Sequence, residues 1–263
     1  MNAPEALDAD LERRFGGLRR LYGDAAYGRL RTLRVAVVGL GGVGSWTAEA
    51  LARCGVASLV LIDLDHVAES NVNRQVQALG ATVGMAKAGA LRERIADIHP
   101  GCVVHAVEEF VDETNWPALL TTPVDAVIDA CDQVRAKATL AAWSLASGTP
   151  LVIAGAAGGK RRPQAIEVAD LAEVTHDPLL ASLRQRLRQK HGAARQGTIG
   201  LRCVFSREAV VVPTQACDVE ANLNCHGYGS TVTVTAAFGL IAAQVGLECA
   251  LARWEPDDAA SRI

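Results

Sequence analysis

The chain has 263 residues, of which half are apolar and only 4% are aromatic, and its formal net charge is -3. This supply of apolar residues predicts one large domain with a substantial core, and the near-neutral charge leaves nucleic-acid binding to a local patch. The seven cysteines are odd in number and include no C-x-x-C pair, and no signal peptide is present, so we expect a cytoplasmic protein without disulfides or zinc.

Residues 1–10 are predicted to be a frayed acidic lead, and residues 11–30 to be helical. In the helical segment basic residues alternate with Phe15, Leu18, Leu21 and Tyr22. Two interpretations remain open at this point. The segment is either a solvated helix pair packed on the rest of the fold, or an arm that brings an arginine to a phosphate, including a phosphate bound by a partner subunit.

Residues 35–38 read as a buried strand that leads into a glycine-rich turn. Gly39, Gly41 and Gly44 have the G-x-G-x-x-G spacing, which permits a tight turn and brings backbone N–H groups close to a phosphate. A helix is expected over residues 43–54, with its positive dipole end directed at that phosphate and Gly55 at its end.

A second strand is predicted at residues 58–62, and Asp63 at its carboxyl end is placed to bind ribose hydroxyls. Up to this point a dinucleotide oxidoreductase fits equally well. The next segment favours a triphosphate, because Asn71, Arg74 and Lys87 follow closely, and Arg and Lys bind phosphate oxygens. Asp65 is expected either to cap the turn at Ser70 or to position this segment.

Helices and strands then alternate, with helices expected at 81–98, 112–120 and 133–147 and strands at 102–107, 124–130 and 151–154. This alternation predicts an α/β fold with a doubly wound, mainly parallel sheet. Ligands of such sheets bind beyond the carboxyl ends of the strands. The Gly39 turn, Asp63 and Asp132 are all expected at that edge.

Asp132 is the candidate metal ligand, because Mg²⁺ prefers carboxylate and phosphate oxygens. The alternative is that Asp132 caps the helix starting at Gln133. Arg74 and Lys87 are expected to stabilise the charge that develops when a carboxylate attacks the α-phosphate of ATP and pyrophosphate leaves.

Beyond residue 154 the alternation stops. Residues 155–162 are glycine-rich and then basic, a short strand is possible at 166–168, and a helix is expected over 179–190. Residues 178–207 contain seven basic residues and no acidic one, which indicates either a solvated helix face with a loop or a footprint for a polyanion. Arg184, Arg188 and His191 share one helical face. The candidate polyanion contacts are Lys160, Arg161, Arg184, Arg188, Lys190 and Arg195.

A strand is expected at 210–213 and a loose tail at 257–263. Residues 227–247 carry no charge, which a hydropathy window reads as a membrane span, but their polar start favours a buried helix over 233–252 and no membrane insertion. The chain is therefore divided into an N-terminal arm (1–33), a nucleotide-binding core (34–157) and an extension (158–263) in the same globule.

The glycine-rich turn, the Asp63–Gln75 segment, Lys87 and Asp132 together resemble the ubiquitin-activating-like adenylyltransferases, which include the molybdopterin and thiamine types. The resemblance covers residues 18–157. It implies a Rossmann-like fold and magnesium-dependent adenylation by ATP. The ATP contacts that it implies are Gly39, Gly41, Gly42, Gly44, Asp63, Asn71, Arg74 and Lys87, with Asp132 holding Mg²⁺.

One branch of this family is similar over nearly the whole chain: the dehydratases that act on threonylcarbamoyladenosine in tRNA. The similar motifs are Arg14–Gly17, Gly155–Gly159, Asp177–Leu179 and Cys203–Ser206. The resemblance implies a cytoplasmic homodimer that activates the substrate carboxylate with ATP and closes a ring beside the tRNA anticodon. A sulfur-transfer partner of the cysteine desulfurase system is left open.

The chain departs from the wider family in lacking the paired cysteines that often bind zinc. Arg20 is the candidate for the N-terminal arginine that reaches a partner's ATP. Cys203 and Cys225 are interpreted as buried thiols rather than nucleophiles. Three rival functions remain: an adenylyltransferase for a ubiquitin-like sulfur-carrier protein, an NAD-dependent oxidoreductase, and a tRNA-binding scaffold without catalysis.

Overall fold

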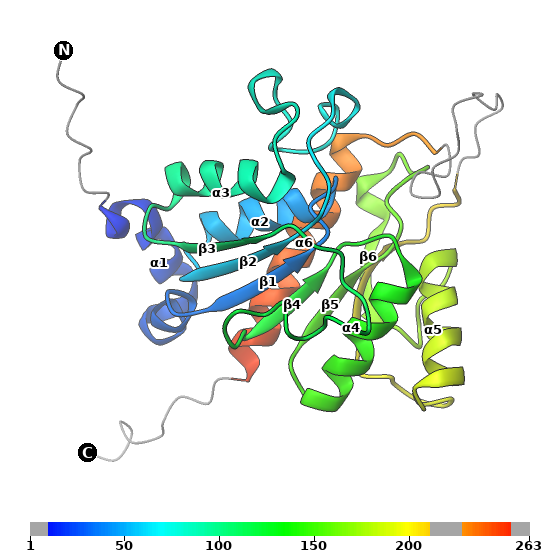
Figure 1. The fold of residues 1–263 in the computed structure, drawn as a ribbon. Helices are drawn as coiled ribbons and strands as arrows, with labels where there is room; N and C mark the ends of the chain where they lie inside the picture. The colour runs from blue at the N-terminus through cyan, green and yellow to red at the C-terminus, as the bar shows by residue number, and fades with distance from the viewer. Residues whose placement is uncertain (1–9, 211–227, 254–263) are drawn as a thin grey trace, which may run out of the picture.

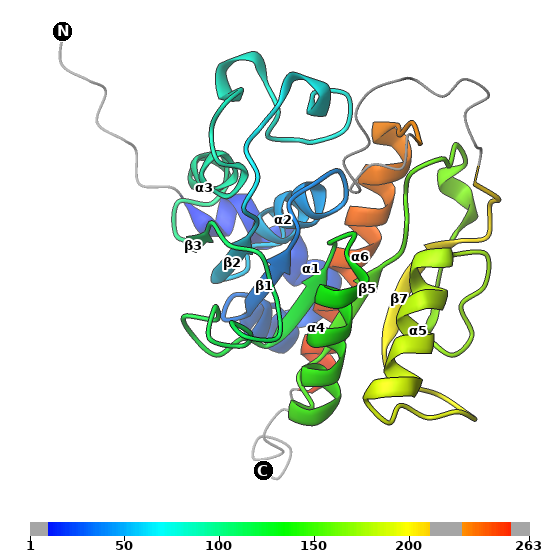
Figure 2. The same cartoon turned by 45° about the vertical axis from the view of Figure 1, so that its right-hand side comes forward.

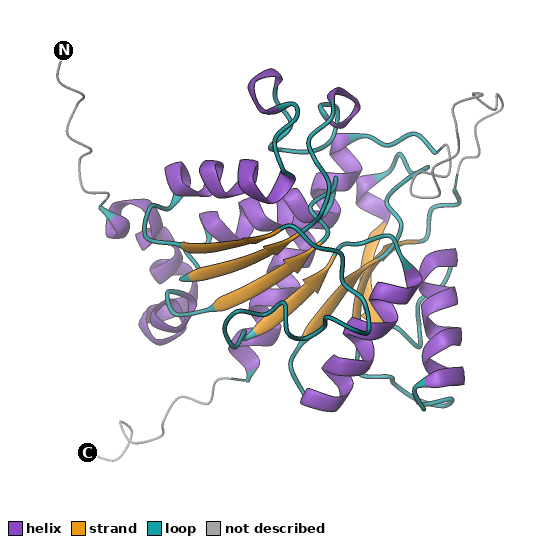
Figure 3. Cartoon of the chain, viewed as in Figure 1, coloured by secondary structure: helices purple, strands orange, loops and turns teal. Residues whose placement is uncertain are grey.

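The protein is described by a computed structural model that covers residues 10–210 and 228–253. A sheet lies at its centre (Figure 3). It has seven strands in the order β3-β2-β1-β4-β5-β7-β6. All neighbouring pairs are parallel except β6 and β7, which are antiparallel. The strands are β1 (Arg34–Val38), β2 (Ser58–Ile62), β3 (Val103–Val107), β4 (Ala126–Asp129), β5 (Leu151–Ala154), β6 (Ile166–Asp170) and β7 (Arg202–Ser206).

Helices cover both faces of the sheet, as the two views in Figures 1 and 2 show. One hydrophobic core joins the sheet to α1 (Leu11–Leu30), α2 (Gly44–Arg53), α3 (Lys87–Ile98) and α6 (Val232–Ala252). The other core joins the opposite face to α4 (Val134–Ser147) and α5 (Pro178–Lys190). The strands β1, β2, β4 and β5 are buried almost throughout because both of their faces are covered. The doubly wound fold is therefore confirmed.

Helix α1 lies at the amino-terminal edge of the sheet. It is broken at Gly23, where φ is 78° and ψ is 168°, so it consists of two helical segments, and the expectation of a helix pair is confirmed. Arg14 donates to the backbone oxygens of Asp97 and Ile98 at the end of α3. The guanidinium of Arg31 lies over the Phe15 ring at 4.7 Å and contacts the buried His99. These contacts fix α1 to the side of the sheet opposite the glycine-rich turn.

Helix α6 meets the length and composition criterion for a membrane span, but more than half of its most apolar window (56%) is buried inside the fold. Phe238 and Val234 are fully buried in the core beneath the sheet. Gly239 lets α6 approach α2 closely, because a Cβ there would lie 2.5 Å from the backbone oxygen of Val43. The structure thus uses this apolar helix as a core element.

Several local expectations were wrong. The segment 112–120 forms turns: Asp112 and Asn115 exchange side-chain to backbone hydrogen bonds at its start, but Pro117 has no backbone N–H with which to continue a helix. Helix α3 starts only at Lys87, after the 3₁₀ turns η1 (Glu69–Asn71) and η2 (Gly80–Thr82). Strand β7 was not predicted, and it lies between β5 and β6 in the sheet. The 3₁₀ turn η3 (Pro163–Ala165) directly precedes β6. The strand expected at 210–213 lies outside the described residues except for Val210, as does the tail at 257–263.

Candidate active site

The glycine-rich turn packs against the loop that follows β4. Gly39 has a positive φ of 83°, and a Cβ there would lie 2.8 Å from the backbone nitrogen of Cys131. A Cβ on Gly44 would overlap the carbonyl oxygen of Gly39. By contrast, a Cβ on Gly41 would meet nothing within 4 Å. The turn is therefore closed on the protein side and open at Gly41, where a phosphate would approach its N–H groups.

This difference gives a matched pair of variants. Gly44→Ala should destabilise the protein by about 3 kcal/mol, because the methyl group has no space beside Gly39. Gly41→Ala should leave thermal unfolding unchanged but weaken ATP binding at least 10-fold, because its methyl group occupies the open side of the turn. Calorimetric titration with ATP and thermal melts would measure both effects. Unchanged ATP affinity of Gly41→Ala would contradict the assignment of the phosphate site.

Asp63 lies directly beside this turn, at the carboxyl end of β2. Its two carboxylate oxygens accept hydrogen bonds from the N–H groups of Leu40 at 2.6 Å and Asp65 at 2.8 Å. Burial raises the pKa of Asp63, and this rise is opposed mainly by the charge of Lys87 and by the two N–H donors. The carboxylate is thus held rigidly at the position expected for a ribose contact.

Lys87 and Asp65 form an ion pair at the same edge. The Nζ of Lys87 lies 2.7 Å from Oδ2 of Asp65, and the lysine side chain is 7% exposed whereas the aspartate is 54% exposed. Asp65 therefore positions Lys87 and does not cap the turn at Ser70. Instead, Oδ1 of Asn71 accepts from the N–H of Ala68 there. A triphosphate would replace or join Asp65 as the anionic partner of this lysine.

Arg74 lies where the segment after β2 meets α2 and α6. Its guanidinium donates to the backbone oxygen of Ser70 at 2.7 Å and to the side chain of Asn73. Its backbone oxygen accepts from the indole of Trp46 at 3.0 Å. A Cβ added to Gly42 would lie 3.4 Å from Cδ of Arg74, so this arginine borders the glycine-rich turn.

Asp132 lies beyond the end of β4 and is exposed. Partial shielding of its carboxyl group from water raises its pKa, and the nearby carboxylates of Asp65 and Asp63 raise it further. Gln133 is the residue that precedes α4, so the expectation of a helix cap at Asp132 was wrong. Within residues 10–210 and 228–253, no three His, Cys, Asp or Glu side chains are grouped to hold a metal. Asp132 therefore fits Mg²⁺ only as a ligand shared with phosphate oxygens.

A buried ion pair behind this edge was not found from the sequence. The Nζ of Lys137 lies 3.1 Å from Oδ1 of Asp129, and both side chains are fully buried. The ammonium also donates to the backbone oxygen of Ala154 at 2.8 Å, and the Cys131 thiol donates to Asp129. Lys137 thereby ties the end of β4 to the end of β5. The sequence offered one signal for this pair: Asp129 ends an apolar strand, and Lys137 follows eight residues later in a predicted helix.

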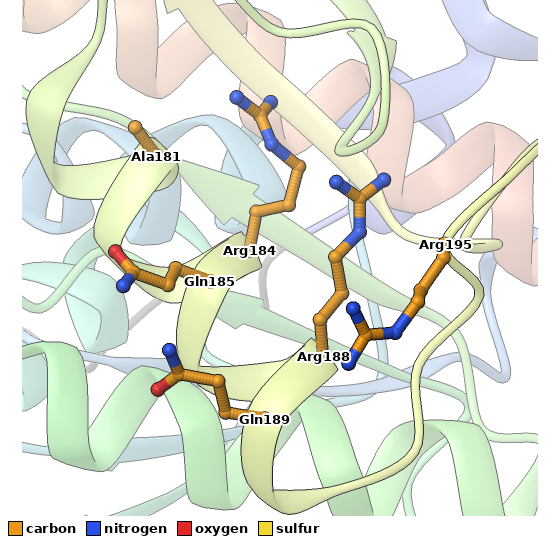
Figure 4. Close-up of a pocket in the computed structure, with 6 residues that line it drawn as sticks. All are labelled: Ala181, Arg184, Gln185, Arg188, Gln189 and Arg195. Carbon is orange, nitrogen blue, oxygen red and sulfur yellow. The ribbon is translucent and has the colours of Figure 1, made fainter.

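The basic residues of α5 and the following loop form an open depression of about 300 Å³ (Figure 4). Arg184 and Arg188 come from one face of α5, and Arg195 reaches across from the loop. The guanidinium of Arg184 donates to the backbone oxygens of Leu171 and Val174, and that of Arg188 to Ala194. These bonds hold Arg184 and Arg188 in place beside the depression. Lys190 is exposed near the end of the same helix.

Lys160 does not belong to this surface. It is 2% exposed, and its ammonium donates to the backbone oxygens of Ser206 at 3.0 Å and Glu208 at 2.9 Å. The expectation of a direct polyanion contact was wrong for this residue, because it stabilises the chain after β7. Arg161 is exposed, and its backbone N–H is bound by the Glu208 carboxylate.

The remaining candidates lie apart from the nucleotide edge. Cys203 is fully buried in β7, and burial strongly raises the pKa of its thiol, which makes it a poor nucleophile. Cys225 lies outside the described residues. Arg20 is exposed on α1, at the opposite edge of the sheet, so it does not approach the glycine-rich turn of its own chain.

The chain is similar to known proteins over most of its length. The model of the ThiF family matches residues 14–261. The chain is 43% identical to tRNA threonylcarbamoyladenosine dehydratase of Escherichia coli over 91% of this chain and 94% of that protein. The Haemophilus influenzae protein of the same name is 39% identical over 88% and 90% of the two chains.

Two further similarities bear on the site. The solved structure of the E. coli dehydratase in complex with ATP has a TM-score of 0.85, covering 98% of this chain and all of that one at 42% identity. Molybdopterin-synthase adenylyltransferase of E. coli is 38% identical, over only 47% of this chain and 49% of that protein. Because the family model and the first two relatives span most of the sequence, the chain belongs to the ThiF family.

Proposed function

We propose that this protein is an ATP-dependent dehydratase that cyclises threonylcarbamoyladenosine beside the anticodon of tRNA. The observation that supports this most strongly is similarity to dehydratases of that name over about nine-tenths of the chain, including the basic extension. The relative that acts in molybdopterin synthesis matches about half of the chain. An arginine-lined depression on α5 supplies the local positive charge that an RNA ligand requires.

In the first step, the threonyl carboxylate of the substrate attacks the α-phosphorus of ATP, and pyrophosphate leaves. The N–H groups of the Gly39–Gly44 turn hold the phosphates, and Asp63 orients the ribose. Lys87 and Arg74 are fixed cations that stabilise the negative charge developing on the phosphate oxygens. The product is a mixed anhydride between the substrate carboxyl group and AMP.

In the second step, an internal nucleophile of the same side chain attacks the activated carbonyl carbon. The ring closes, AMP leaves with the former carboxylate oxygen, and the nucleophile loses its proton. The nucleoside has then lost the elements of one water. No protein nucleophile is required, which agrees with the buried state of Cys203, and no sulfur is transferred, so the scheme requires no cysteine desulfurase partner.

Mg²⁺ would be held by Asp132 together with phosphate oxygens. When bound, such an ion neutralises phosphate charge and orients the phosphates. The exposed carboxylate of Asp132, with its pKa raised, fits this use, because a divalent cation would relieve its repulsion by Asp65 and Asp63.

The protein would act in the cytoplasm as a homodimer. α1 is fixed at the edge of the sheet opposite the glycine-rich turn, so Arg20 would reach ATP only in a partner subunit. The dimer proposal thus accounts for the separation between Arg20 and the nucleotide edge of the same chain.

The decisive experiment mixes purified protein with ATP, Mg²⁺ and tRNA that carries the threonylcarbamoyl group. Mass spectrometry of the digested nucleosides should show the loss of one water. No loss would overturn the proposal. The rival sulfur-carrier function predicts ATP–pyrophosphate exchange that depends on a small protein ending in Gly-Gly and is indifferent to tRNA.

The RNA surface has its own test. Replacing Arg188 and Arg195 together with Gln should weaken tRNA binding and reduce the slope of log K against log salt by about 1–2, because each phosphate contact releases condensed counterions. Arg92→Gln, an exposed change on α3, is the matched control and should leave the slope unchanged. An unaltered slope for the double variant would exclude this depression as the RNA site.

A further inference from the structure

The arginine-lined depression is continuous with a second cleft nearer the nucleotide edge. This cleft of about 380 Å³ shares Ala181 and Arg184 with the depression. Its remaining wall includes Thr175, His176 and Pro178 from the start of α5 and Ala209 and Val210 after β7. From Asp177 to Arg188 the groove extends along eleven residues of helix, or about 16 Å at 1.5 Å per residue.

The cleft is anchored to the end of β5, on the side of the glycine-rich turn away from Asp63. Asp177 is buried, and its carboxylate accepts from the N–H of Ala156, which directly follows β5, at 2.9 Å. β5 is two strands from β1 on the β4 side, whereas Asp63 follows β2 on the other side. At about 4.8 Å per strand, the end of β5, to which Asp177 is bonded through Ala156, lies on the order of 10 Å across the sheet from the end of β1. With the ribose on the β2 side, an acceptor would approach over β4 and β5.

His176 stands out in this cleft. It is exposed, and with a φ of 60° it is the only non-glycine residue with positive φ among residues 10–210 and 228–253. Its ring contacts the Thr175 hydroxyl at 2.9 Å. Such backbone strain persists where surrounding structure imposes it, and it concentrates at ligand-binding positions. The neighbouring Asp177 is buried, and its side chain caps α5 and accepts from Ala156, so the chain beside His176 is firmly held.

The chemistry of the cleft suits one unstacked nucleotide. An exposed imidazole and the proline ring beside it offer surfaces on which a base can stack, and apolar Val174 and Ala209 complete the wall. Arg184 stands at the junction with the basic depression, where the phosphate of that nucleotide would lie. An RNA strand would thus follow the arginines along α5 and end with a base at the nucleotide edge.

We infer that this cleft receives the base of the modified adenosine, unstacked from the anticodon loop. The inference rests on the proposed function. The threonylcarbamoyl group extends from the base, so the base must lie to one side of the reacting carboxylate. A binding position beyond β5 places the base to one side of the glycine-rich turn and Asp132. The modified side chain would then extend over the Gly155–Gly159 segment towards the α-phosphate of ATP.

The test uses His176→Asn, because asparagine tolerates positive φ but lacks the ring. With modified tRNA, kcat/KM should fall about 5- to 150-fold, the range for the loss of one base-stacking contact. ATP binding and the salt slope of tRNA binding should not change. His105→Asn, in β3 at the opposite edge of the sheet, is the matched control and should behave as wild type.

The affinities of wild type and His176→Asn for modified and unmodified tRNA then show whether the cleft binds the modified base. A smaller preference of His176→Asn for modified tRNA supports the inference, whereas equal losses for both tRNAs, or no loss, overturn it. Ala209→Trp, which fills the cleft from its other wall, should reproduce the effect without changing His176. If wild-type protein dehydrates the substrate and both variants match it, only the cleft assignment fails. If wild type is inactive, the proposed function fails first.

Discussion

Replacement of Lys87 by methionine is expected to slow adenylate formation about 10²–10³-fold, the usual cost of removing one fixed donor from a developing anion. Methionine keeps most of the volume of this buried side chain, and Asp65, which loses its partner, is half-exposed and remains hydrated. The fold should therefore survive. Single-turnover formation of pyrophosphate with modified tRNA measures the effect, and filter binding of tRNA should give wild-type affinity.

Asp65→Asn serves as the control for this lysine. It removes the resting partner of Lys87 but leaves the ammonium present, so adenylation should change far less than in Lys87→Met. Equal defects in both variants would mean that the ion pair is structural and that Lys87 does not act on the triphosphate. Loss of tRNA binding in Lys87→Met would likewise contradict the assigned role.

Asp132→Asn is expected to abolish magnesium-dependent activity and, in addition, to stabilise the protein slightly. The folded-state pKa of Asp132 is raised by partial shielding from water and by two neighbouring carboxylates. Above this pKa the group is charged in both states, and only the folded state bears the repulsion. The free energy of unfolding is therefore lower at pH 7 than it would be with a neutral side chain. Thermal melts at pH 7 should show a higher midpoint for Asp132→Asn.

Asp170 is expected to have the opposite effect on stability, because its carboxylate stabilises the folded protein at pH 7. Four backbone N–H groups donate to it, from Ala172 and from Ile199 to Leu201, and they lower its pKa although burial opposes this. Its contribution to stability is present above its unfolded-state pKa and is lost as pH falls through the folded-state value. Asp170→Asn should therefore lower the melting midpoint at pH 7. A lower midpoint for Asp132→Asn would show that its carboxylate is a structural group.

The sequence predicted the glycine-rich turn and the strands beside it well because their signals are local. Gly39 and Gly44 have backbone and packing requirements that few other residues meet, and periodic apolar runs identify β1, β2, β4 and β5. The same local reasoning overestimated a helix at 112–120. The side chains of Asp112 and Asn115 form bonds typical of a helix start, but Pro117 lacks the backbone N–H that a longer helix requires.

The errors in the second half of the chain have a different cause. β7 contains only five residues and lies in a segment dominated by basic residues, so its alternation was overlooked. Lys160 resembles its exposed basic neighbours in sequence, and only the carbonyl groups of Ser206 and Glu208 reveal that it is buried. The pair of Asp129 and Lys137 likewise depends on a contact between different strand ends. Such features are set by tertiary packing and leave almost no local signal.

The position of β7 within the sheet has a consequence for how this enzyme type can evolve. β7, which leads to the cleft at Ala209, is hydrogen-bonded to β5 in the same sheet as the strands that end at the glycine-rich turn and Asp63. Under the proposed function, substrate recognition is therefore not a separate module, and transferring it to another adenylating core would require grafting an internal strand together with its covering helix. New acceptors would be acquired more readily by altering the rim around His176 and Ala209, which leaves the shared scaffold intact.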